Sequence, residues 1–173
     1  MTEQINDICI LDGREWLVEE SYELNRIAPT NEQLGFSTIM TSTANLSGRI
    51  DHYLVFKHYL YLFKVEVSLP DDQRNLVPPG ARREMRYLYD QVRVTGDDGM
   101  KIKEQVHERR YFIYDDLKID YSGELVLLYP TGDEWEYLRP LQDDDLEPYL
   151  EATLVFHRGK LEGYEERSLT DDE

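Results

Sequence analysis

Cysteine is almost absent from the chain, because Cys9 is the only one among 173 residues. A single thiol excludes an intramolecular disulfide framework and indicates a reducing compartment. Cys9 stands between Ile8 and Ile10 in a strand-like run. This setting predicts a small buried apolar side chain and not a reactive thiol.

Long apolar runs are also missing. No run approaches the length that crosses a membrane, and the first residues, MTEQINDICIL, show no basic region followed by an apolar one. We therefore expect a cytoplasmic protein with no membrane partner.

Motifs that carry chemistry are lacking as well. The sequence contains no glycine-rich phosphate loop, no paired cysteines and no nucleophile elbow. The histidines do not have the spacing of metal ligands on a helix; they are His52, His58, His107 and His157. We predict no catalytic residue, no cofactor and no metal site.

Basic residues are scarce relative to acidic ones, with 19 Lys and Arg against 36 Asp and Glu and a net charge of −17. The 12% aromatic content argues against a disordered acidic chain. Such a charge repels nucleic-acid backbones and attracts cationic proteins. We expect no nucleic-acid partner and a basic, toxin-like protein partner; the oligomeric state stays open.

Most of the chain reads as strands joined by turns. Asp12-Gly13 lies between two apolar arms, which is a strong hairpin signal. Lys57-His58 is the expected turn of a second hairpin with arms near 50–56 and 60–68, and the last hairpin should turn at residues 157–159.

The block from 50 to 67 has apolar residues at most positions. Alternation along its second arm puts Leu60 and Leu62 on one face, and Tyr59, Tyr61, Phe63, Val65 and Val67 on the other. Both faces are apolar, which predicts a strand covered on both sides. We predict core positions at Leu54, Phe56, Leu60 and Leu62, with a dimer seam or ligand wall as the alternative.

The middle of the chain is ambiguous. Residues 69–80 hold three prolines and read as a linker. Residues 83–90 have helical propensity, but apolar residues alternate there and TGDDG is a good turn, so a long charged hairpin is favoured over a helix. Residues 82–94 stay open between the two.

The predicted fold is mainly β, with antiparallel hairpins packed as two sheets or a half-barrel and at most one or two short helices. A single domain covers 1–173. Leu54-Val55-Phe56 recurs as Leu154-Val155-Phe156, and Ser47-Gly48 recurs as Ser122-Gly123. These echoes suggest pseudo-repeat halves at 1–69 and 111–169, joined by 70–110.

The stretch STANLSGRIDHYLVFKHYLYL resembles a group of uncharacterised bacterial proteins with the signature S-T-A-x-W-x-G-Y, a strand, then L-Y-L. The later S-G-x-L of those proteins corresponds to Ser122–Leu125 here. The sequence departs from the signature at Leu46, where Trp is expected, and at Arg49, where Tyr is expected. The resemblance implies a strand-rich bacterial protein and brings no known activity.

The best candidate for a partner surface is the acidic loop 131–148. Aromatic anchors rimmed by charge are typical of protein-binding patches. The candidate partner-binding residues are Trp135, Tyr137, Asp143, Asp144 and Asp145. The alternative is that the two aromatic side chains only pack over the sheet.

The leading hypothesis is a small acidic binding or inhibitor protein, comparable to immunity proteins or antitoxins, that acts by protein–protein interaction. The alternative is a small-molecule-binding protein or hydrolase with a pocket between the two halves, using Asp51, His52 or tyrosines. A mimic of DNA is a third hypothesis, which requires carboxylates spaced like phosphates.

Overall fold

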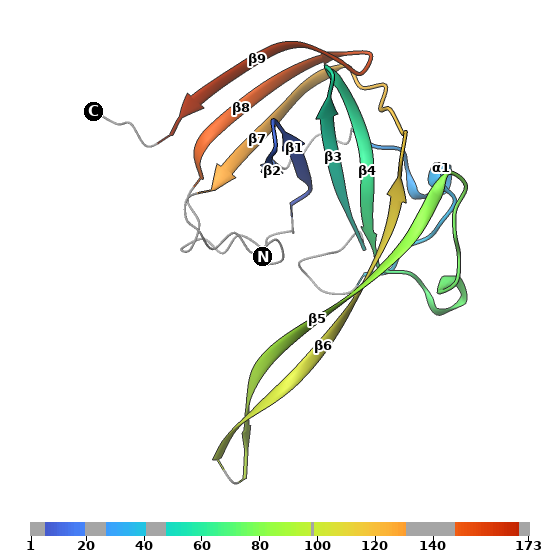
Figure 1. Cartoon of the computed structure of the whole chain (residues 1–173), viewed down its shortest axis with the longest axis vertical. Helices are drawn as coiled ribbons and strands as arrows, with labels where there is room; N and C mark the ends of the chain where they lie inside the picture. The colour runs from blue at the N-terminus through green and yellow to red at the C-terminus, as the bar shows by residue number, and fades with distance from the viewer. Residues whose placement is uncertain (1–5, 20–26, 41–47, 98, 131–147, 170–173) are drawn as a thin grey trace.

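Nine strands dominate the computed structural model of the chain, which describes residues 6–19, 27–40, 48–97, 99–130 and 148–169 (Figure 1). Helical structure in this part is confined to one four-residue α-helix and one 3-10 turn, so the prediction of a mainly β fold is confirmed. The elements are β1 (Ile8–Leu11), β2 (Arg14–Val18), α1 (Asn31–Leu34), β3 (Arg49–Phe56), β4 (Tyr59–Val67), η1 (Asp71–Gln73), β5 (Ala81–Gly96), β6 (Gly99–Tyr114), β7 (Gly123–Pro130), β8 (Pro148–His157) and β9 (Lys160–Ser168).

Seven of these strands form a closed ring. The sheet order is β3-β1-β2-β7-β8-β9-β4-β6-β5, and β3 also pairs with β4. The β4–β9 contact that completes the ring is short: Tyr59 pairs with Lys160, and the Leu161 amide donates to the His58 carbonyl at 2.7 Å. Only β1 and β3 run parallel; the other pairs are antiparallel.

Three tight turns define the hairpins of the ring. The backbone angle φ is positive at both central residues of Asp12-Gly13, Lys57-His58 and Arg158-Gly159. This is the pattern of type I′ turns, whose twist matches that of paired strands. All three turns lie where the sequence predicts them, so these predictions are confirmed.

A bulge in β4 changes the predicted faces of that strand. Tyr53 pairs with Leu62 but His52 pairs with Lys64, so Phe63 is an extra residue and the alternation shifts by one. As a result Leu60, Leu62, Val65 and Val67 all face the core, and each is at most 5% exposed. The prediction that Val65 and Val67 lie on the face opposite to Leu60 is therefore wrong.

The predicted core is confirmed only in part. Leu60 and Leu62 are fully buried, whereas Leu54 is half-buried and Phe56 is 51% exposed. In β3 the inward positions are Arg49, Asp51, Tyr53 and Val55, so Leu54 and Phe56 point outward. The core is completed by inward residues of the other strands: Cys9, Trp16, Phe112, Leu127, Leu154 and Phe156.

The repeated sequence Leu-Val-Phe, at 54–56 and 154–156, does not occupy equivalent positions in its two hairpins. Phe56 is the last residue before its turn and pairs with Tyr59, whereas Phe156 is one residue further from its turn and pairs with Leu161. Phe156 is 2% exposed, unlike Phe56. Phe56 and Phe156 therefore do not occupy equivalent places in the two hairpins, and a duplication of the halves stays a prediction.

Residues 82–94 are strand and not helix, because β5 and β6 pair residue for residue from Ala81–Tyr114 to Gly96–Gly99. Near Tyr114 this hairpin joins the ring, where β6 pairs with β4 over Arg110–Ile113. From Tyr87 and Glu108 outward, each of its strands pairs only with the other in the described part of the chain. We call the section 87–108 the arm, and Figure 1 shows it projecting away from the ring.

Candidate functional site

The partner-binding residues predicted from the sequence lie outside the described residues. These are Trp135, Tyr137, Asp143, Asp144 and Asp145, all between 131 and 147. Their role stays a prediction, and the described surface has to be considered on its own.

A buried ion pair occupies the interior side of β3. Arg49 and Asp51 are two residues apart on one strand, so both point inward. The Arg49 Nε donates to Asp51 Oδ1 at 2.6 Å, and the Arg49 and Asp51 side chains are 2% and 11% exposed.

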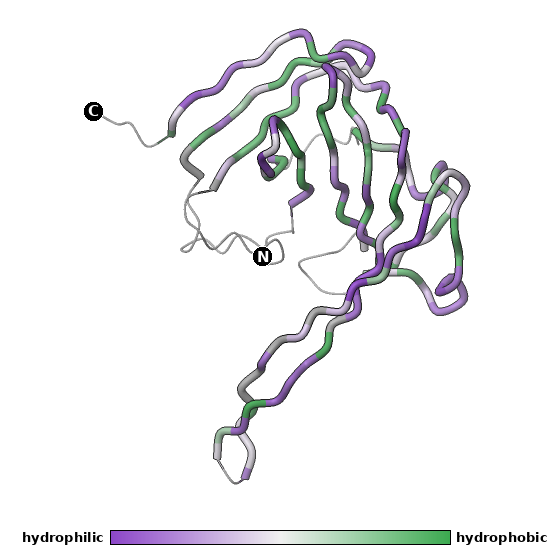
Figure 2. Tube along the Cα trace, in the orientation of Figure 1, coloured by the Kyte–Doolittle hydropathy of each residue, from purple (hydrophilic) through white to green (hydrophobic). Residues whose placement is uncertain are grey.

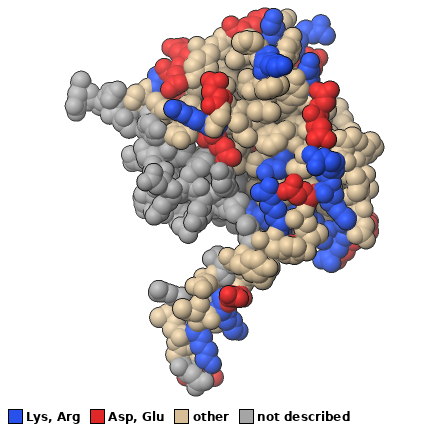
Figure 3. Space-filling view, in the orientation of Figure 1, with Lys and Arg blue, Asp and Glu red and all other residues tan. Residues whose placement is uncertain are grey.

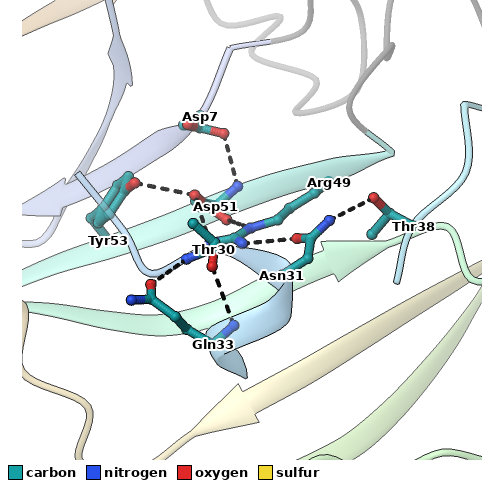
Figure 4. A network of polar contacts seen from close by, with 8 residues as sticks. All are labelled: Asp7, Thr30, Asn31, Gln33, Thr38, Arg49, Asp51 and Tyr53. Carbon is teal, nitrogen blue, oxygen red and sulfur yellow. Dashed lines mark hydrogen bonds and ion pairs between the residues drawn. The ribbon is translucent and has the colours of Figure 1, made fainter. Parts of the chain in front are cut away.

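Further hydrogen bonds surround the pair (Figure 4). The Tyr53 hydroxyl donates to Asp51 Oδ2 at 3.1 Å, and the Arg49 Nη1 donates to the Asn31 side-chain oxygen at 2.9 Å. Asn31 in turn donates to the Thr38 hydroxyl at 2.9 Å. The network therefore connects β3 to α1 and to the segment that follows it.

The network is better suited to holding the fold than to catalysis. Burial, then Asp51 and Asp7, hold the pKa of Tyr53 well above its usual value, so its phenol stays protonated and donates. The two oxygens of Asp51 accept from Arg49 and Tyr53, which leaves this carboxylate poorly placed to accept a proton from a substrate. No described group here is an exposed nucleophile beside a base.

A cavity of about 470 Å³ lies next to this network. It is lined by Gln33, Leu34, Gly35, Pro79, Gly80, Tyr114, Asp115, Asp116 and Leu117. Tyr114 is buried, and its hydroxyl has no hydrogen-bond partner within the described structure. Burial raises the pKa of Tyr114, with opposing effects from Arg49 and Asp51, so this tyrosine connects the cavity electrostatically with the ion pair.

His52 lies on the other side of β3 from Asp51, because adjacent strand residues alternate in direction. Its Nε2 is buried without a partner in the described part of the chain. Burial, then the Lys64 and Arg86 charges, lower its pKa to about 3. Asp51 and His52 therefore cannot form the acid–base pair that the enzyme hypothesis could use, and the described residues hold no cluster of metal ligands.

The arm carries several of the large apolar side chains that are exposed in the described structure. Strand register places the odd residues of β5 and the even residues of β6 on one face. Five large apolar side chains on this face are 52–74% exposed: Tyr87, Tyr89, Met100, Ile102 and Val106. We call these five residues the arm stripe; Figure 2 shows hydrophobic segments along the arm, far from the core of the ring.

The charge of the hairpin is opposite to that of the rest of the chain. The hairpin 81–114, its turn included, holds 8 basic and 6 acidic residues, which gives +2, so the remainder carries −17 − 2 = −19. The arm alone holds 3 basic and 5 acidic residues, so the basic excess lies close to the ring. Figure 3 shows Lys and Arg gathered where the hairpin joins the ring, and basic and acidic residues together along the arm. At this junction Arg109 pairs with Glu66 at 3.0 Å, and Arg86 pairs with Glu84 at 2.6 Å.

The alternation of Tyr87, Tyr89, Val92 and Val94 predicts the hairpin but was not interpreted as a partner surface. Alternating apolar residues on a hairpin rich in charge could have indicated such a surface. What the sequence did not reveal is that no described element packs against the stripe.

The chain matches no known protein family, curated protein or solved structure in the three comparisons made. Among the described residues, no helix is long and apolar enough to span a membrane.

Proposed function

We propose that this protein is a small acidic binding or inhibitor protein that acts by protein–protein interaction, in the manner of immunity proteins or antitoxins. The observation that carries the proposal is the arm stripe. The stripe has one apolar group at Tyr87, Tyr89 and Val106 and a second at Ile102 and Met100, separated by the Gln91–Glu104 pair. Exposed groups of large apolar side chains often mark the interaction sites of soluble proteins.

The arm is also costly to keep without a partner. A two-stranded hairpin that packs on nothing is only marginally stable in water. The stripe contains two tyrosines, Tyr89 being 74% exposed, and tyrosine is among the residues that most often dominate binding energy. A partner that covers this face would bury the aromatic rings and stabilise the ribbon at once.

The negative charge of the ring favours a protein partner that has a basic surface. The chain outside the hairpin 81–114 carries −19, which accelerates association with a cationic protein and repels polyanions. The absence of a complete catalytic constellation in the described residues leaves binding as the activity that the geometry best supports.

The test compares partners captured by three forms of the full chain from a lysate of the source organism at low salt. Tyr89→Ser combined with Ile102→Ser removes two anchors of the stripe, and Val94→Ser changes an apolar residue on the opposite face of the same arm. A captured protein is then purified and its binary affinity is measured. We expect the double variant to bind at least about tenfold more weakly and Val94→Ser to bind like the wild type. Equal binding by all three forms for every partner would rule out the arm as the binding surface.

A small-molecule site is the second candidate, and the cavity beside Tyr114 supports it. The cavity combines apolar walls with a buried hydroxyl that lacks a protein partner. A melting-temperature survey of ligands on the wild type and on Tyr114→Phe tests it. A ligand whose stabilisation disappears in Tyr114→Phe supports the site, whereas no shift with any compound class argues against it.

A further inference from the structure

Two arginines converge on one carbonyl oxygen where the hairpin joins the ring. Arg83 of β5 and Arg110 of β6 each donate from Nη1 to the Arg74 carbonyl, at 3.1 and 3.0 Å. Arg74 follows the 3-10 turn η1, so its carbonyl is one of those that the end of a helix leaves without a partner inside the helix. The two Nη1 atoms are at most about 6 Å apart, because both donate to the same oxygen.

One neutral oxygen does not balance two guanidinium charges. Glu108 lies 3.6 Å from Arg110, and its side chain is 44% exposed. Arg83 is exposed and has no ion pair with another described residue. A guanidinium has five N–H donors, of which the Arg74 carbonyl takes one from each arginine. The pair therefore has donors and charge left for an oxyanion, which guanidinium groups bind through paired N–H donors.

The two arginines lie on the same face of the hairpin as the arm stripe. Arg83 is an odd residue of β5 and Arg110 an even residue of β6, and these positions share the face of the stripe. The next two pairs outward hold the apolar group of the stripe that is nearer the ring: Tyr87 with Glu108 and Tyr89 with Val106. We call Tyr87, Tyr89 and Val106 the inner group; each of them is 52–74% exposed.

We propose that the partner of the arm presents the carboxylate of an Asp or Glu side chain to Arg83 and Arg110, and apolar side chains to the inner group. The proposal rests on the proposed function, since it takes the arm stripe as the binding surface, and it adds the chemistry of the partner segment. Clusters of arginine are a recurrent means of recognising acidic motifs in proteins.

The spacing on the hairpin predicts the spacing in the partner. Successive pairs on one face of a strand are about 7 Å apart. An extended segment of the partner places every second side chain on one face at the same interval. We therefore expect an acidic residue in the partner with apolar residues two and four positions away from it.

The acidic residues on this face confine the expected carboxylate to the ring end of the stripe. Beyond the inner group the next pair is Gln91 with Glu104, and Glu104 would repel an acidic side chain placed there. Glu108 competes with the incoming carboxylate for Arg110. The net charge of −17 opposes the contact only weakly, because exposed charges more than about 8 Å away are largely screened at physiological salt.

The first test selects segments that bind the wild-type full chain from a displayed library of random short peptides. We expect enrichment of Asp or Glu two and four residues from apolar side chains. Arg83→Gln should then weaken the binding of an enriched peptide at least about tenfold. Arg82→Gln is the matched control, because it removes the same charge from the opposite face of β5 and should bind like the wild type.

The second test determines the sign of the ligand charge. Glu108→Gln removes the carboxylate that lies nearest to Arg110, so an acidic peptide should bind this variant more tightly than the wild type. Changing the acidic residue of the peptide to its amide should weaken binding to the wild type but hardly to Arg83→Gln, because that variant already lacks the contact. Arg83 is exposed, so its substitution should leave the fold intact, which circular dichroism checks.

A purely structural role for the two arginines gives different results. If they only hold η1 against the hairpin, Arg83→Gln lowers the melting temperature and leaves the affinity for the peptide unchanged. That outcome overturns the inference, as do enrichment of basic or uncharged segments, no enrichment at all, and weaker binding by Glu108→Gln. Titration with inorganic phosphate, followed by the NMR signals of the arginine Nε–H groups, tests for a free anion. Phosphate binding without any enriched peptide would also overturn the inference.

The outcomes separate this inference from the proposed function. A captured protein partner that requires Tyr89 and Ile102 but is indifferent to Arg83→Gln overturns the inference and leaves the proposed function standing. An acidic peptide that requires Arg83 and is unaffected by Tyr89→Ser with Ile102→Ser would contradict the role of the stripe, on which both rest.

Discussion

Removing the carboxylate of the buried ion pair should be among the most destabilising single changes in the protein. Asp51→Ala leaves the Arg49 guanidinium, whose side chain is 2% exposed, without the acceptor for its Nε and Nη2. The Tyr53 hydroxyl loses its acceptor too, whereas Arg49 Nη1 keeps its hydrogen bond to the Asn31 side-chain oxygen.

The magnitude follows from these lost partners. Breaking a buried pair by removing one member costs about 3–5 kcal/mol, because an uncompensated charge stays in the interior. An unsatisfied buried hydroxyl adds about 1–3 kcal/mol when nothing replaces its acceptor. Since water entering the space left by the carboxylate offsets part of both losses, we expect a total near 3–5 kcal/mol.

Urea unfolding monitored by circular dichroism and by the fluorescence of the buried Trp16 measures this loss. The control is Asp115→Ala, which breaks the exposed pair with Arg82 and should leave the midpoint almost unchanged. Arg49→Met combined with Asp51→Leu removes both charges and should recover most of the loss. A loss below about 1 kcal/mol for Asp51→Ala, or a double variant as unstable as the single one, would refute the assignment of an orphaned charge.

Three further predictions concern the core, a turn and pH. Phe156→Ala should destabilise by about 3–5 kcal/mol in urea, and Phe56→Ala by much less, because the first side chain is 2% and the second 51% exposed; equal losses would contradict the inward and outward assignment. Gly13→Ala should cost about 1–2 kcal/mol for its left-handed backbone. Gly159→Ala should cost clearly more, since its Cβ would also lie 2.3 Å from a carbonyl oxygen; similar losses would show that the turn yields. The pKa of His52 is lowered from 6.5 to about 3, so the unfolded chain binds this proton more tightly. The free energy of unfolding should therefore be greatest above pH 6.5 and should fall below it by up to about 1.4 kcal/mol per pH unit. His52→Gln should flatten this pH dependence. An unchanged pH dependence in this variant would be inconsistent with a buried neutral imidazole.

The turns were predictable because their chemistry is local. Asp12-Gly13 and Arg158-Gly159 each contain a glycine at the second central position, which a type I′ turn favours. Lys57-His58 has no such residue and was found only from the apolar arms around it. Turn positions of this kind depend on two residues and their flanks, which a sequence displays directly.

The faces of β4 were not predictable, because a bulge depends on the partner strand. The sequence alternates across Leu62, Phe63 and Lys64 without interruption, and nothing local marks Phe63 as the extra residue. The same holds for the parallel pairing of β1 with β3, which joins segments about 40 residues apart in the chain. These features are set by long-range contacts.

The ion-pair network shows that residue spacing in a sequence does not predict burial. Arg49 and Asp51 are two residues apart with opposite charge, but Glu84 and Arg86 share this spacing and form an exposed pair on β5. Spacing on a strand gives a common face and leaves the environment of that face open. The buried pair became evident only when the ring placed that face inside.

The net charge of the chain conceals differences in charge between its elements. A net charge of −17 predicts attraction to basic proteins and repulsion of polyanions, and this reasoning applies to the chain outside the hairpin. The fold places eight of the 19 basic residues on β5 and β6, and five of these eight lie between the ring and the arm, which itself holds 3 basic and 5 acidic residues. The charge that a partner meets at one part of the surface can therefore differ in sign from the mean charge. The salt dependence of binding by Lys101→Glu with Lys103→Glu, compared with that of Glu165→Lys with Glu166→Lys, therefore reports which of the two fields a partner uses.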